Sequence, residues 1–206
     1  MLWGLIDTAR FDPRHWRNLP AVGVSLDGLW LRGPALSPAE WLEWGQAISR
    51  LIPQVPLWIG GNVLAARALK ADGLQLPSHH LAARRVRDQW DRPIAASVHS
   101  LEEYERHREA DWFIWGHAYA TRSKPGMLPR SRASLEAILK RTAHPVMIIG
   151  GVNASTVSEV AHWGGSGVVV GDGIWQQSNP AAAAAVIKDL WNQEARGGTP
   201  TDDLDS

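Results

Sequence analysis

The sequence of 206 residues contains no cysteine. Disulfides, thiolate zinc sites and cysteine nucleophiles are therefore excluded. An excess of charge is missing as well: Lys plus Arg number 21, Asp plus Glu also number 21, and the formal net charge is zero. Nucleic acid or an anionic membrane as main partner would favour a basic excess. We therefore expect neither of these partners.

Long apolar runs are also lacking. No run approaches the roughly 20 residues that cross a bilayer. The first ten residues, MLWGLIDTAR, carry no basic leader and reach Asp7 too early for a signal peptide. These features predict a soluble cytoplasmic protein. Phe and Tyr occur only twice each, whereas Trp occurs 12 times, and we assign most of the tryptophans to core or interface positions.

Short apolar runs alternate with longer segments that carry helix signals. Each run is short and apolar, which is typical of a strand buried on both faces. The expected strands span residues 2–7, 26–32, 56–60, 73–77, 93–98, 111–116, 145–150 and 167–171. This alternation predicts parallel strands joined by right-handed helical crossovers.

The expected helices begin with recognisable caps. Ser37 and Pro38 stand where an N-cap and a first helical residue belong. Ser100 followed by Glu103 has the spacing of a capping box. The expected helices span residues 37–52, 100–110, 131–142, 153–165 and 179–195. The segment 12–22 is the weakest helix, because Pro13 and Pro20 leave little room for one.

Eight strands in one chain of this length predict a single-domain (β/α)8 barrel over residues 1–196. An open doubly wound sheet is the alternative, but eight regular units favour the barrel. Residues 197–206, GGTPTDDLDS, are polar and predict a disordered C-terminal tail.

A barrel of this kind places active sites at the carboxyl ends of its strands and binds phosphate after strands seven and eight. Gly150 ends the seventh expected strand and Gly151 follows it, and Gly171 ends the eighth with Gly173 just beyond it. Glycine lets the backbone approach an anion closely. We predict that these four glycines form a phosphate site, although either pair alone is a common turn feature.

His117 ends the sixth expected strand and falls on the same rim. Imidazole can accept and donate a proton near neutral pH, so we predict a catalytic role for it. Thr121 and Lys124 in the following loop, and Arg32 at the end of strand two, are the predicted substrate-binding residues. A solvated lysine and a surface ion pair are the alternatives for Lys124 and Arg32.

Other histidines are less suited to chemistry. His99 follows strand five, where packing or capping is the simpler interpretation. His79 and His80 are adjacent and point apart on one backbone, with no Asp or Glu at a suitable spacing. We predict no metal site.

Four segments resemble a known family. They are DGLQLPSHHL, SVHSLEEYERHREADWFIWGHAYATRSKPG, PVMIIGGVNASTVSEV and GVVVGDGIW. Together they are similar to the thiamine phosphate synthase superfamily over roughly residues 24 to 190. GLQLPS and the histidine in WGHAYAT look more like its TenI branch, the thiazole tautomerases, than like the synthase itself.

The resemblance implies a (β/α)8 barrel and an isomerase. A thiazole tautomerase converts a carboxylated thiazole phosphate tautomer into its aromatic isomer, in thiamine biosynthesis, without a cofactor. The resemblance assigns His117 as the proton shuttle, the four glycines to the phosphate and Arg32 to the anionic groups of the substrate. The expected partner is therefore a small phosphorylated thiazole, and a homodimer is a reasonable expectation for the assembly.

Several positions depart from the synthase pattern. Trp30, Arg32 and Pro34 stand where the synthase has Gln, Arg and Lys. Its Asn-Asp pair after strand three is replaced by Gly60 and Gly61, and its acidic residue after strand four is lost within PSHH. The carboxylates that would hold magnesium are missing. Asp172 replaces a small hydroxylated residue beside the phosphate.

These departures favour the tautomerase as the main prediction. Thiamine phosphate synthase is the alternative enzyme. A catalytically silent binder of thiazole phosphate is the alternative from another class.

Overall fold

The computed structural model describes residues 1–197. Eight parallel strands close into a barrel in the order β1 to β8, with β8 pairing with β1. The strands are β1 (Leu2–Asp7), β2 (Gly28–Arg32), β3 (Leu57–Gly60), β4 (Gly73–Leu76), β5 (Ile94–Val98), β6 (Trp112–Gly116), β7 (Val146–Ile149) and β8 (Gly167–Val170). The predicted (β/α)8 barrel is confirmed, and each strand lies within the predicted range.

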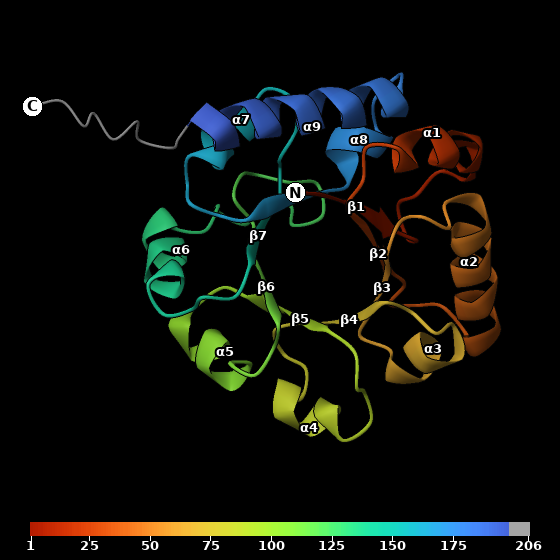
Figure 1. Ribbon diagram of the computed structural model, residues 1–206, viewed down its shortest axis with the longest axis horizontal. Coiled ribbons are helices and arrows are strands. Elements are labelled where there is room, and N and C mark those ends of the chain that lie inside the picture. The colour runs from red at the N-terminus through yellow and green to blue at the C-terminus, as the bar shows by residue number, and fades with distance from the viewer. Residues whose placement is uncertain (198–206) are drawn as a thin grey trace, which may run out of the picture.

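The helices surround the strands as an outer ring (Figure 1). They are η1 (Pro13–Asn18, a 3-10 helix), α1 (Leu19–Gly23), α2 (Pro38–Leu51), α3 (Val63–Ala68), α4 (Ala83–Arg87), α5 (Leu101–Arg106), α6 (Arg132–Leu139), α7 (Val157–Ala161), α8 (Asp172–Trp175) and α9 (Pro180–Gly197). In the described chain no helix is long and apolar enough to cross a membrane. The predicted tail lies outside the described residues, apart from Gly197, which ends α9.

Caps explain where the helices begin. Ser37 accepts from the backbone N–H of Glu40, whose carboxylate accepts from the N–H of Ser37, so α2 carries a complete capping box. At α5, Ser100 caps the helix, but Glu103 accepts from the N–H of His99 instead. The first helical segment is divided into the 3-10 helix η1, which begins at Pro13, and the short helix α1, whose second residue is Pro20. The turn predicted after β8 is the short helix α8.

Two groups of buried side chains hold the barrel. The larger lies between strands and helices. The smaller fills the barrel interior with residues from seven strands: Trp3, Trp30, Trp58, Ala95, Ile114, Met147 and Val169. Trp3 packs against Trp58 and Trp112, with ring centroids 4.6 and 5.2 Å apart. Tryptophan therefore serves as the main filler of the barrel, and the carboxyl-end rim above it is open to ligands.

Candidate active site at the barrel rim

Two adjoining cavities open at the carboxyl ends of the strands. The β7–β8 cavity, about 860 Å³, is lined mainly by the loops after β1, β6, β7 and β8. The β2–β6 cavity, about 650 Å³, is lined mainly by the ends of β2 to β6 and the loops that follow them. Both are lined by Leu5, Asp7, Thr121, Ser123, Ile149 and Gly150. The rim therefore has room for two ligands side by side.

The four predicted glycines all line the β7–β8 cavity. Gly150 and Gly151 have φ of 101° and 72°, a left-handed conformation that favours glycine. A Cβ on Gly150 would lie 2.3 Å from Cβ of His117, and one on Gly173 would lie 2.3 Å from the carbonyl of Val152. Close packing at the rim therefore requires glycine at positions 150, 151 and 173, whereas a Cβ on Gly171 would meet ordinary contacts from 3.6 Å. Phosphate binding by the four glycines stays a prediction.

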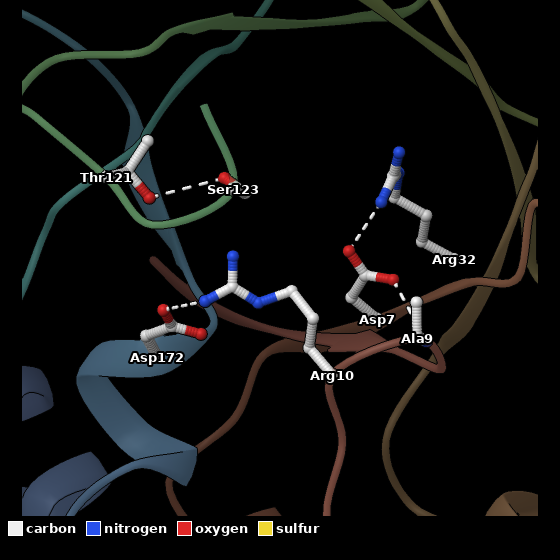
Figure 2. A network of polar contacts seen from close by, with 7 residues as sticks. All are labelled: Asp7, Ala9, Arg10, Arg32, Thr121, Ser123 and Asp172. Atoms are coloured by element: carbon white, nitrogen blue, oxygen red, sulfur yellow. Dashed lines mark hydrogen bonds and ion pairs between the residues drawn. The ribbon is translucent and has the colours of Figure 1, made fainter. Parts of the chain in front are cut away.

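Asp172 faces the β7–β8 cavity and forms an ion pair with Arg10 (Figure 2). Arg10 lies in the loop after β1, and Asp172 begins α8 after β8, so closure of the barrel brings the two together. The pair places an acid and its counter-charge at the wall of the cavity. The negative charge of Asp172 is thereby compensated within the site.

His117 lies in the β2–β6 cavity, away from Asp172. Its side chain is 2% exposed, and Nε2 lies 3.4 Å from the carbonyl oxygen of Met127. Nδ1 is buried and has no hydrogen-bond partner in the described chain. Burial is the main cause that lowers the pKa of His117. Near pH 7 the imidazole is therefore neutral and has a ring nitrogen available to a ligand.

Cationic groups gather around the same cavity. Burial, and next to it the charge of Arg130, lowers the pKa of Lys124. Arg32 also repels Lys124 and forms an ion pair with Asp7 (Figure 2). The two predicted substrate-binding cations, Lys124 and Arg32, are thus brought together at one cavity. The repulsion between the positive charges of Lys124 and Arg32 is relieved when an anion binds in this cavity.

Thr121 lies at the boundary between the cavities. Its hydroxyl is 3.2 Å from that of Ser123, and both residues line both cavities (Figure 2). His99, predicted to pack or cap, is half-buried and lines the β2–β6 cavity. Burial lowers its pKa as well. His79 and His80 line the same cavity, so it contains three histidines beyond the one predicted for the site.

Two residues that line the cavities, Arg10 and Gln75, and one whose charge acts on Lys124, Arg130, had no predicted role. Arg10 and Arg130 gave no motif, although the position of Arg10 just after strand one could have placed it on the rim. Gln75 lies within GLQLPS and had no predicted role of its own, yet it is 1% exposed and lines the β2–β6 cavity. A polar residue within an apolar strand was the signal that could have found it.

The residues at the rim do not fit a magnesium ion held by carboxylates. Mg²⁺ prefers oxygen ligands, usually one or two carboxylates. Among the described residues, the acidic residues lining the two cavities are Asp7, which is paired with Arg32, and Asp172, which is paired with Arg10. Within residues 1–197 no three His, Cys, Asp or Glu side chains are grouped to hold a metal. The cationic side chains are the groups present to meet a negative charge.

Fold and cavities together define a (β/α)8 barrel of the class that carries its active site at the carboxyl-end rim. The family model described as thiamine monophosphate synthase matches residues 20–174. The thiamine-phosphate synthase of Desulfitobacterium hafniense (strain Y51) is 34% identical over 176 residues, covering 82% of this chain and 84% of that protein. The chain therefore belongs to the thiamine monophosphate synthase family, which is a family of enzymes.

Further similarities agree with this assignment. The thiamine-phosphate synthase of Chlorobium phaeobacteroides is 29% identical over 179 residues, covering 84% of this chain and 87% of that protein. The solved thiamine phosphate pyrophosphorylase of Pyrococcus furiosus superposes with a TM-score of 0.82 at 22% identity, covering 94% of this chain and 96% of that one. At this identity the second similarity shows the fold alone.

The prediction of a thiazole tautomerase is wrong. The relatives that match at 29 to 34% identity over most of the chain are named thiamine-phosphate synthase, a transferase, so the isomerase class is not supported and the TenI branch is not confirmed. The branch prediction depended on GLQLPS and on His117. Both features line a cavity that also contains the cations Arg32 and Lys124, and a histidine in such a cavity does not define one reaction.

Proposed function

We propose that the protein is a thiamine-phosphate synthase, which transfers a pyrimidine from a diphosphate to the nitrogen of a thiazole phosphate. The C–O bond to the diphosphate breaks and its electron pair leaves with the diphosphate. The lone pair of the thiazole nitrogen forms the new C–N bond. Thiamine phosphate and pyrophosphate are the products.

The single observation that carries this proposal is the pair of adjoining cavities in a chain of this family. A transferase must hold two substrates side by side, and the shared wall at Thr121, Ser123 and Gly150 provides for that. An isomerase with one substrate has no need of two. The glycine-lined β7–β8 cavity is the proposed site of the thiazole phosphate.

The β2–β6 cavity is the proposed site of the pyrimidine diphosphate. Lys124 and Arg32 carry positive charge where the departing diphosphate gains negative charge, and such preorganised charge stabilises the transition state. The neutral imidazole of His117 offers a ring nitrogen beside them without adding to the local repulsion. A cytoplasmic location and a homodimer belong to the same proposal and remain predictions.

The test is to incubate the purified protein with the pyrimidine diphosphate and thiazole phosphate, with magnesium added and with a chelator. Thiamine phosphate should form at a rate proportional to the enzyme concentration. Calorimetric titration of each substrate runs in parallel. Binding of both substrates without any product would overturn the synthase in favour of a silent binder.

A further inference from the structure

Besides the Nδ1 atoms of His80, His99 and His117, two buried polar atoms on the strands that form the floor of the β2–β6 cavity lack hydrogen-bond partners in the described chain. They are the indole Nε1 of Trp30 and the amide Oε1 of Gln75. The two side chains are 6% and 1% exposed, and both line the cavity. Buried polar groups in native proteins are nearly always hydrogen-bonded, so a donor and an acceptor left open in one cavity require an explanation.

The orientation of the Gln75 amide is fixed by its neighbours. Nε2 donates to the carbonyl oxygen of Leu76 at 2.7 Å and to the hydroxyl of Ser97 at 2.8 Å. A carbonyl oxygen only accepts, so the NH₂ group must face Leu76. A flipped amide would bring two oxygens together. Oε1 is therefore the atom left free, and it is an acceptor.

The open donor lies beside the open acceptor. Gly60 on β3 is the registered neighbour of Gln75 on β4, and registered residues of parallel strands project to the same side of the sheet. A Cβ on Gly60 would lie 2.6 Å from Nε1 of Trp30. The indole N–H thus occupies the space that a side chain at Gly60 would take, next to Gln75.

We infer that Trp30 and Gln75 determine specificity by reading a donor–acceptor edge of the pyrimidine. Trp30 Nε1–H donates to a ring nitrogen, and Gln75 Oε1 accepts from the amino group on the adjacent carbon, an edge that the pyrimidine of thiamine carries. Lys124 and Arg32 on the rim above meet the diphosphate. The inference rests on the proposed function, because that function supplies the pyrimidine.

The first experiment measures binding, which is independent of turnover. The indole N–H signal of Trp30, assigned by its loss in Trp30→Phe, should shift when the pyrimidine diphosphate is added and stay in place with inorganic pyrophosphate. Measured by calorimetry, Trp30→Phe and Gln75→Leu should each lower the affinity for the pyrimidine diphosphate about tenfold, which is the cost of one lost hydrogen bond in a buried site.

The second experiment changes the ligand. A pyrimidine diphosphate without the amino group should bind the wild type about tenfold more weakly, and Gln75→Leu should bind both ligands alike. Trp58→Phe is the matched control, because Trp58 lies in the same buried group but does not line the cavity. It should leave both affinities unchanged.

Gly60→Ala tests the same point if Trp30→Phe fails to fold, because its methyl group displaces the indole N–H. Equal binding of the two ligands by the wild type, or affinities within twofold of wild type in these variants, would overturn the inference. Specific binding of the pyrimidine diphosphate with no formation of thiamine phosphate would instead overturn the proposed function and leave the roles of Trp30 and Gln75 in binding supported. The two failures are therefore distinguishable.

Discussion

We expect Arg10 to preserve anion binding in the β7–β8 cavity, because it neutralises the negative charge of Asp172. Replacing Arg10 with Ala leaves a bare carboxylate facing the bound phosphate. Two unit charges about 5 Å apart repel by about 3 kcal/mol at an effective dielectric of 20. The side chains of Arg10 and Asp172 are 26% and 37% exposed, so water screens this repulsion. We expect a loss of about 1 to 2 kcal/mol, or about 5- to 30-fold weaker binding.

The assay is calorimetric titration of thiazole phosphate at low and high salt. The loss in Arg10→Ala should shrink at high salt, because ions screen the exposed carboxylate. Adding Asp172→Ser to Arg10→Ala should restore most of the affinity, and Asp172→Ser alone should tighten binding by freeing Arg10. Arg14→Ala is the control, because Arg14 pairs with Asp12 and does not line the cavity.

Three results would refute this reasoning. Arg10→Ala within twofold of wild type would show that Asp172 does not act on the ligand. A double variant as weak as Arg10→Ala would show that Arg10 binds the phosphate directly and that its compensation of Asp172 is immaterial. Clear weakening in Asp172→Ser would contradict the repulsive role of the carboxylate.

Three further outcomes follow from the site. Lys124→Met should lower kcat for thiamine phosphate about 10²- to 10³-fold and leave thiazole phosphate binding within twofold; equal losses in both would contradict the assignment. His117→Gln should lower kcat at least tenfold without lowering the affinity for thiazole phosphate. Wild-type turnover in this variant would exclude a catalytic role for His117. Burial lowers the pKa of the fully buried His107, so its contribution to stability is complete above an unfolded pKa of about 6.5. That contribution is lost as pH falls below 6.5. The free energy of unfolding in urea, measured from pH 5 to 8, should show this loss, and His107→Gln should make its pH dependence flatter. His79→Gln is the control, because His79 is exposed.

The strands were predictable because each is buried on both faces and reads as a short apolar run. The predicted range 2–7 is β1, and the range 167–171 exceeds β8 by one residue. Once eight parallel strands are known, all their carboxyl ends meet at one rim. That geometry alone placed His117, Lys124 and the glycines at 150 and 171 in one region. The short helices α3 and α4 lie in segments for which the sequence predicts no helix, although α5 and α7, which are as short, lie within predicted ones.

The reaction could not be predicted from the same residues. A histidine and glycine turns suit several reactions, and their presence favoured the wrong enzyme. Under the proposed function the two adjoining cavities hold two substrates, and the lining of each cavity depends on side chains from many strands. Similarity to relatives over most of the chain, rather than any motif, corrected the class.

The sequence by itself determined the barrel, the position of its rim and the chemical groups on each loop, because these depend on local apolar patterns and on chain order. Only the tertiary structure decided which groups meet. Arg10 and Asp172 are 162 residues apart and pair because β1 and β8 close the barrel. Trp30 and Gln75 share a cavity floor because the strand between them presents Gly60. Such contacts arise from closure and packing, which no local pattern encodes.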